Sequence, residues 1–416
     1  MSLDPVLDHF RPGRTIYLPG ATGEIPLVCD LLAADPERMA GVDIVSCLLP
    51  GMNSFDYAGL HERARLTTFL FSPASRESFA AGRVKLHPLS YSSIARYLQH
   101  DAGLDVAVAH VAPPLPGEGR TASVGIAADF TAIAWRAART RIAIVNPLMP
   151  AMLRGPRIDL DEADLVAEGE SPLVEVPAVA ANATGQAIAA HAAGLIPDGA
   201  TLQVGIGSAP TALWRALASH RQLRLHSGLA SSDLLHLADM GVLAADGHVA
   251  GICAGTKDFY HAMADRDLVR LSDTRETHDA RAIGMKDKFF AANSALAVDL
   301  FGQINLEWQG DSPQSGVGGG PDFATAALLS SCGGAITMLP STARDGSVSR
   351  IVAQLDTPTV SLPRNLADAI VTEHGVAQLR NKSLDERAEA LIAIADPAFH
   401  GELEQQWRDM RQAMSR

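Results

Sequence analysis

The sequence has few of the residues that mark metal sites, disulfide frameworks or membrane spans. Its only cysteines are Cys29, Cys47, Cys253 and Cys332, and their spacing matches no metal-binding pattern. We expect reduced thiols in the core of a cytoplasmic protein, and no bound metal. No apolar run is long enough to cross a bilayer, and residues 1–5 lack the basic segment and apolar stretch of a signal peptide.

Positive charge is also in deficit, because 47 acidic residues outnumber 34 lysines and arginines and leave a formal net charge of −13. This balance argues against nucleic acid, and against an anionic membrane, as a partner. A chain of 416 residues is longer than one domain usually is, and a hydrophobic share of 47% is ample for two cores. We therefore expect a large soluble enzyme of two domains. As its assembly we expect a homodimer, the commonest soluble oligomer.

The order of apolar and polar segments predicts an α/β fold. A short strand, a glycine-containing turn and a helix follow one another twice, beginning at residues 15–18 and again at 201–204. The apolar, β-rich runs between later helices favour largely parallel sheets that are buried on both faces. Near the C-terminus, Ser383 and Glu386 have the spacing of a capping box, which predicts a helix running to about Ala395.

A stretch of small residues at 176–184 is the predicted boundary between the two halves. It precedes a helix that we expect over 186–195. We therefore place the two α/β domains at residues 1–182 and 183–416, with the second domain carrying the glycine-rich loop described next.

A run of glycines is the most informative local feature of the chain. Residues 316–320 read Gly-Val-Gly-Gly-Gly, and four glycines in five positions cost too much conformational entropy for a helix or strand interior. We expect a loop that lacks β-carbons and so lets its amide N–H groups approach a bound molecule closely, as oxyanion and phosphate sites require. A long surface turn is the alternative interpretation.

The motifs around this loop follow the order of a known enzyme family. They are Gly316-Val317-Gly318-Gly319, Pro340-Ser341, Asp345-Gly346-Ser347, Arg364-Asn365, Thr372-Glu373-His374-Gly375-Val376-Ala377-Gln378-Leu379 and Lys382-Ser383-Leu384-Asp385-Glu386-Arg387-Ala388. From about Leu202 to Phe399 the chain resembles the C-terminal domain of the acetyl-CoA hydrolase/transferase family. This family is the branch of class I CoA transferases that includes 4-hydroxybutyrate CoA-transferase. Toward the N-terminus the resemblance is weaker.

The resemblance implies two CoA-transferase-like α/β domains and an enzyme that acts on acyl-CoA thioesters and carboxylic acids. Coenzyme A would enter as part of a substrate, with no further cofactor. The turn 205–210 resembles the family segment that borders the acyl-CoA site, whereas a dinucleotide site is disfavoured because proline replaces the third glycine. The residues implied in substrate or CoA binding are Gly205, Gly207, Gly316, Gly318, Gly319, Gly320, Arg364 and Asn365.

Two positions depart from the family pattern. In class I CoA transferases a glutamate attacks the thioester, and in this branch it follows His-Ser or His-Thr at a strand end. Here Gly228 follows His226-Ser227, so the nucleophile position carries no carboxylate. His278 stands where the family has an asparagine that helps to position the thioester. A histidine there can be a general base near neutral pH or a hydrogen-bonded structural residue.

Three functions are compatible with these residues. The first is hydrolysis of acyl-CoA thioesters, with His278, Glu276 or Asp233 as the base. The second is CoA transfer without a covalent glutamate, or through Glu24 or Glu276 from another turn. The third is a catalytically inactive protein that binds CoA or acyl-CoA. The retained glycine loop and the motifs after it favour a working ligand site, with hydrolysis or CoA transfer as its chemistry.

Overall fold

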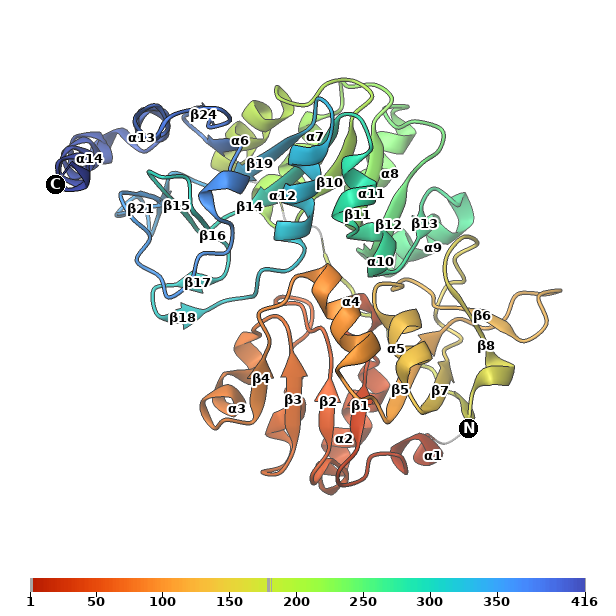
Figure 1. The fold of residues 1–416 in the computed structure, drawn as a ribbon. Coiled ribbons are helices and arrows are strands. Elements are labelled where there is room, and N and C mark those ends of the chain that lie inside the picture. The colour runs from red at the N-terminus through yellow and green to blue at the C-terminus, as the bar shows by residue number, and fades with distance from the viewer. Residues whose placement is uncertain (1–2, 178–179, 181, 416) are drawn as a thin grey trace.

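Two α/β halves follow one another along the chain, each built around its own sheet (Figure 1). The computed structural model describes residues 3–177, 180 and 182–415. Within these residues, one main sheet has seven strands and the other has eight. All neighbouring strands of the two sheets are parallel except the last pair of the second sheet, so the predicted α/β class with largely parallel sheets is confirmed.

The first sheet has the strand order β4-β3-β2-β1-β5-β7-β9. Its strands are β1 (Thr15–Tyr17), β2 (Asp43–Val45), β3 (Arg65–Thr68), β4 (Val84–Leu86), β5 (Val106–Val111), β7 (Thr140–Val145) and β9 (Leu165–Glu168). The helices that alternate with them include α2 (Pro26–Ala34), α4 (Tyr91–His100) and α5 (Thr131–Ala137). Helices on both faces explain why every residue of β5 is buried.

The second sheet has the order β13-β12-β11-β10-β14-β19-β23-β24. Its strands are β10 (Thr201–Val204), β11 (Arg224–Ser231), β12 (Val249–Ala254), β13 (Arg270–Leu271), β14 (Phe289–Ser294), β19 (Gly334–Met338), β23 (Ala369–Thr372) and β24 (Gly375–Gln378). The helices are α6 (Ala183–Ala193), α7 (Ser208–Ala216), α8 (Asp233–Asp239), α9 (Lys257–Arg266), α10 (Thr274–Thr277), α11 (Ala280–Gly284) and α12 (Gly320–Leu329).

Both sheets share one topology, which places the ligand site. Their first strands, β1 and β10, lie between the second and fifth strands of their own sheets. In each sheet the chain runs from the first strand to the strands on one side and later returns to the strands on the other side. In parallel α/β sheets such a switch point opens a crevice at the carboxyl ends of the strands. In the second half this point lies between β10 and β14, where residues 203–204 and 293–294 end the strands.

Short strands and two terminal helices complete the second half. The strands β15 (Ala297–Asp299), β16 (Ile304–Asn305) and β22 (Ile351–Val352) form a small sheet, and α13 (Leu384–Ala393) and α14 (His400–Met414) follow β24. The predicted capping box is confirmed, since Ser383 and Glu386 exchange side-chain-to-backbone hydrogen bonds at the start of α13. None of the helices in the described residues is long and apolar enough to cross a membrane.

Two local predictions need correction. Helix α6 begins at Ala183 rather than 186, because the Asn182 side chain caps it by accepting a hydrogen bond from the Gly185 N–H at 2.9 Å. Cys332 is exposed, whereas the other three cysteines are buried as expected. The predicted boundary stretch 176–184 includes residues 178, 179 and 181, which lie outside the described part of the chain.

Candidate active site between the two halves

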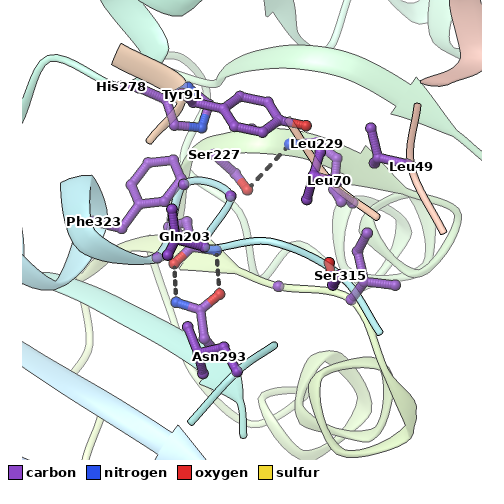
Figure 2. Close-up of a pocket in the computed structure, with 18 of the residues that line it drawn as sticks. Leu49, Leu70, Tyr91, Gln203, Ser227, Leu229, His278, Asn293, Ser315 and Phe323 are labelled. Atoms are coloured by element: carbon purple, nitrogen blue, oxygen red, sulfur yellow. Dashed lines mark hydrogen bonds between the residues drawn. The ribbon is translucent and has the colours of Figure 1, made fainter. Parts of the chain in front are cut away.

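A cavity of about 290 Å³ lies where the two halves meet, at the carboxyl ends of β10 and β14 (Figure 2). The second half contributes the ends of these strands, part of β11 and the glycine loop. The N-terminal half contributes Leu49, Pro50, Leu70, Tyr91 and Asp129. Most of the walls are apolar, as is typical of pockets that enclose a small organic ligand.

The glycine loop needs its glycines because its backbone is packed too closely for side chains. A Cβ on Gly316 would lie 2.4 Å from the Phe69 carbonyl oxygen, and one on Gly319 would lie 2.6 Å from Nε2 of His278. Gly318 has φ of +55°, a left-handed backbone angle that favours glycine. The glycines are therefore required because the loop backbone lies close to Phe69 and His278. The loop forms part of the cavity wall, which excludes the interpretation of this run as a surface turn.

Free amide groups in this loop can bind an oxyanion. Among the described residues, no hydrogen-bond acceptor is paired with the backbone N–H of Val317, Gly318 or Gly319. The loop leads directly into α12, whose N-terminus adds a partial positive charge at the same place. Unpaired N–H groups beside a helix N-terminus stabilise negative charge that develops on a carbonyl oxygen during acyl transfer.

Gly228 lies on β11 with the imidazole of His278 directly in front of it. A Cβ built on Gly228 would be 3.2 Å from Cε1 and 3.3 Å from Nε2 of that ring. This separation is tighter than an ordinary van der Waals contact, so a side chain at position 228 requires the ring to move. The two positions identified from the sequence, Gly228 and His278, therefore form one contact: His278 fills the space that a side chain at position 228 would need.

His278 is held by aromatic packing and is uncharged at neutral pH. Its ring stacks on Tyr91 with centroids 4.7 Å apart and contacts the ring of Phe323 at 4.5 Å (Figure 2). Burial, with a smaller contribution from His226, lowers the pKa of His278 to about 3. The expectation that this residue titrates near neutral pH is therefore wrong, because the imidazolium form would have to give up its hydration.

The other two candidate bases do not join His278. Glu276 accepts hydrogen bonds from the Arg270 guanidinium and from the Ser272 hydroxyl, which lower its pKa to about 2. It does not line the cavity. Asp233 pairs with Arg215 at 3.3 Å and lines a second, smaller cavity of about 150 Å³. These ion pairs favour structural or ligand-binding roles over proton abstraction at Gly228.

The glycines assigned to CoA binding are close together, whereas the arginine–asparagine pair lies elsewhere. Gly205 lines both cavities, and Gly207, with φ of +128°, lines the second. Gly316, Gly318, Gly319 and Gly320 all line the first cavity. Arg364 and Asn365 are exposed on a turn at 364–366 and line neither cavity. The structure therefore does not support contact between this pair and a molecule in the cavity.

Several residues that line the cavity were not predicted from the sequence. Gln203 and Asn293 join the ends of β10 and β14 through two reciprocal amide hydrogen bonds of 3.0 and 2.8 Å (Figure 2). Asp129 and Tyr91 come from the N-terminal half, where the motifs are weakest. Nothing near either residue in the sequence distinguishes it from an ordinary loop or helix residue, because only the packing of the two halves brings it to the cavity.

Comparison with known proteins agrees with this geometry. The model of the acetyl-CoA hydrolase/transferase C-terminal domain matches residues 255–407. The chain is 33% identical to 4-hydroxybutyrate coenzyme A transferase of Clostridium kluyveri over 92% of its own length and 91% of that protein.

The chain belongs to the acetyl-CoA hydrolase/transferase family.

Solved structures extend this relationship over nearly the whole chain. The crystal structure of RipA from Yersinia pestis, 26% identical, superposes with a TM-score of 0.91 and covers 99% of this chain and 97% of its own. A 4-hydroxybutyrate CoA-transferase from Porphyromonas gingivalis, 27% identical, gives a TM-score of 0.81 with 98% and 96% coverage. Family membership confirms the prediction from the ordered motifs and supports the expected enzyme class, CoA transfer or acyl-CoA hydrolysis.

The contact between Gly228 and His278 predicts that substitutions at the two positions are coupled. Gly228→Ala alone should lower the free energy of unfolding by about 1 kcal/mol or more, because its Cβ presses on the ring. In the His278→Asn background the cost should be smaller, since asparagine leaves more space. Urea unfolding of the four proteins measures this coupling, expected at about 0.5–1 kcal/mol.

As a control, Gly228→Ala combined with Ser383→Ala should be additive within about 0.5 kcal/mol, because Ser383 is the N-cap of α13 and does not contact Gly228 or His278. The same cost of Gly228→Ala in both His278 backgrounds would show that the ring does not occupy this space.

Proposed function

We propose that this protein binds acyl-CoA thioesters in the cavity between its two halves and hydrolyses them with water as the nucleophile. The observation that carries the proposal is the imidazole of His278 in front of Gly228. A glutamyl intermediate cannot form at a glycine, and the ring already lies within 3.3 Å of a Cβ built at this position. The retained glycine loop supports a site that still stabilises a thioester carbonyl.

The hydrogen bonds of His278 indicate which ring nitrogen faces the cavity as an acceptor. The Thr277 hydroxyl donates to the Asp273 carbonyl oxygen at 3.3 Å. We assign it as the acceptor of its 2.9 Å hydrogen bond with Nδ1–H of His278, the tautomer that lets this hydroxyl keep both hydrogen bonds. This tautomer leaves Nε2, the atom beside Gly228, unprotonated. A neutral imidazole in this orientation can accept a hydrogen bond from water and hold it near the thioester.

In the proposed reaction the thioester carbonyl oxygen accepts hydrogen bonds from the free N–H groups at 317–319. Water held by His278 attacks the carbonyl carbon, the carbon–sulfur bond breaks, and the departing sulfur takes up the proton that water loses. The products are a carboxylic acid and the CoA thiol. The second cavity shares Gly205, Ile206 and Leu229 with the first, which supports it as the path of the CoA portion.

CoA transfer to a second carboxylate is the other candidate reaction. The observation in its favour is that the compared relatives bear the names of CoA transferases. With no carboxylate at position 228, this reaction would need either direct attack by the second acid or a carboxylate from another position.

Incubation with acetyl-CoA or butyryl-CoA, with and without acetate, separates these reactions. We expect free thiol to appear at the same rate in both conditions, and no acyl exchange onto acetate. Free thiol is measured with a chromogenic disulfide, and exchange by mass spectrometry of the CoA esters. Thiol release that requires acetate would identify a transferase. Calorimetric binding without either reaction would identify a CoA-binding protein, and absence of binding would remove the proposed site.

The low pKa of His278 makes a specific pH prediction. Because the ring stays neutral above about pH 3, its contribution should be equally present across the neutral range. His278→Asn should therefore slow hydrolysis by the same factor at pH 6 and pH 8, on the order of 10²-fold. The measurement is kcat of both proteins across this range. A factor that grows as the pH rises through 6.5 would mean that His278 titrates with an ordinary pKa.

Restoring the family pair should convert the chemistry. In Gly228→Glu/His278→Asn the new carboxylate gains the space that the ring occupied, so exchange between acyl-CoA and acetate should appear. Intact-mass spectrometry should then detect a covalent CoA adduct. Borohydride should reduce this glutamyl thioester to an alcohol with release of CoA thiol, and peptide mapping should locate the reduced residue at position 228. Gly228→Glu alone should be destabilised and inactive in exchange, and His278→Asn alone should show no adduct. A folded double variant without adduct or exchange would contradict the proposed placement of the thioester.

A further inference from the structure

Asp129 enters the cavity from the N-terminal half at a position set by the C-terminal half. The residues before it run antiparallel to β12: Ala127 pairs with Ile252, and the Ala128 N–H donates to the Gly251 carbonyl oxygen at 2.9 Å. The Asp129 carbonyl oxygen accepts from the Thr274 N–H at 2.9 Å. Strand β12 is also the neighbour of β11, which carries Gly228. Asp129 is therefore fixed to the same sheet that carries Gly228.

The carboxylate of Asp129 is buried and only partly satisfied. The residue is 5% exposed, and its Oδ1 accepts a hydrogen bond from the Phe130 N–H at 2.7 Å. Its Oδ2 takes no hydrogen bond from the described residues, and it is not among the completely buried unpaired atoms. Asp129 lines the cavity, so its incompletely bonded carboxylate borders the space in which a ligand would bind.

No cation accompanies this carboxylate. Among the described residues that line the cavity, none is a lysine or an arginine. The titratable groups around Asp129 are Tyr17 of β1, Cys47 after β2, Tyr91 of α4 and, across the cavity, His278. Burial raises the pKa of both tyrosines and of the cysteine, and the low pKa of His278 keeps it neutral. All four are uncharged between pH 6 and pH 8.

We propose that Asp129 is a specificity-determining residue that excludes acyl groups bearing a free carboxylate. On this proposal, which rests on the proposed binding of acyl-CoA in this cavity, the substrates are CoA thioesters of monocarboxylic acids with uncharged chains.

The physical reason is repulsion between two carboxylates, that of Asp129 and that of the acyl group, with no cation to balance them. Succinyl and butyryl chains have equal carbon number, but succinyl ends in a carboxylate where butyryl ends in a methyl group. A carboxylate in this cavity loses water, finds no cation and faces Asp129. The butyryl methyl group instead meets leucine and isoleucine side chains of the wall. Since both ligands carry the same CoA portion, the ratio of their affinities reports only the difference between the two acyl groups.

The pH dependence of this ratio follows from the titration of Asp129. Burial raises the pKa of this carboxyl to about 7, with the Phe130 hydrogen bond acting in the opposite direction. Above this pH the group is charged and repels a second carboxylate, and below it the group is neutral. The succinyl carboxylate itself stays charged over this range. Discrimination against succinyl-CoA should therefore be stronger at pH 8 than at pH 6.

The first experiment measures the dissociation constants of butyryl-CoA and succinyl-CoA for the native protein by calorimetry at pH 6 and pH 8. We expect butyryl-CoA to bind on the order of 10²-fold more tightly at pH 8. About tenfold of this comes from the charge of Asp129, the most that a group with a pKa of about 7 contributes one pH unit above that value, and the rest comes from burying the succinyl carboxylate without a cation. The ratio should fall by about tenfold at pH 6. This measurement needs no variant and no catalytic turnover.

The second experiment uses Asp129→Asn, whose amide can donate hydrogen bonds to a carboxylate. Succinyl-CoA binding at pH 8 should improve by about tenfold, butyryl-CoA binding should change by less than about twofold, and the ratio should no longer depend on pH. Asp299→Asn is the matched control. Asp299 is a buried carboxyl with a raised pKa, is hydrogen-bonded by Gln303 and does not line the cavity. Its substitution should leave the ratio unchanged.

The outcomes separate this inference from the proposed function. Butyryl-CoA that binds while succinyl-CoA binds equally well at pH 8 overturns the role of Asp129 alone. A ratio that is independent of pH in the native protein also overturns it, whether or not Asp129→Asn folds. Failure of both ligands to bind overturns the proposed acyl-CoA site, and with it the inference.

Discussion

The hydrogen bonds that join the two halves are the constraint on which the site depends. Residues 126–128 extend the second sheet by pairing with β12, and the Phe71 and Tyr91 N–H groups donate to the carbonyl oxygens of Ser315 and Gly318, each at 3.2 Å. The side chains of Ser90 and Ser92, at the start of α4, also bond to Asp322 of α12. The cavity wall, the glycine loop and the aromatic stack on His278 are consequences of this docking.

This docking also explains why the loop is rich in glycine. Its carbonyl groups must reach the backbone of the N-terminal half while its N–H groups stay free for a ligand. A side chain at position 316 would collide with the Phe69 carbonyl, and one at 319 with His278. The loop can satisfy both halves and still present amide donors only because it lacks β-carbons. Packing and ligand binding therefore select the same residues.

His278 and Gly228 depend on each other, because the ring of one fills the space left by the missing side chain of the other. The imidazole occupies the volume in front of β11 and remains neutral because Tyr91, Phe323 and Thr277 surround it. The consequence is a cavity in which the only carboxylate belongs to Asp129, on the wall from the other half, among the described lining residues. In the proposed reaction this cavity uses positioned water in place of a covalent nucleophile, and the inferred role of Asp129 puts the charge of the site at the acyl end.

Much of the fold and part of the site followed from local sequence. The strand–turn–helix units, the capping box at Ser383 and the family assignment all rest on residues that lie next to one another in the chain. The pKa of His278, the ion pair of Glu276 and the placement of Asp129 could not be predicted in this way. His278 and Asp129 depend on neighbours supplied by segments far away along the chain, and the ion pair of Glu276 depends on the turn that brings Arg270, six residues earlier, beside it.

The sequence by itself determined the α/β class, the family and the presence of a glycine-rich ligand loop, because backbone propensity, strand burial and motif order are short-range properties. It also located the two unusual positions, Gly228 and His278. Only the tertiary structure decided that these two residues contact each other, that Glu276 is held away from the cavity and that Asp129 lies in its wall. The physical reason is that charge, desolvation and free volume at a site depend on atoms brought together by folding.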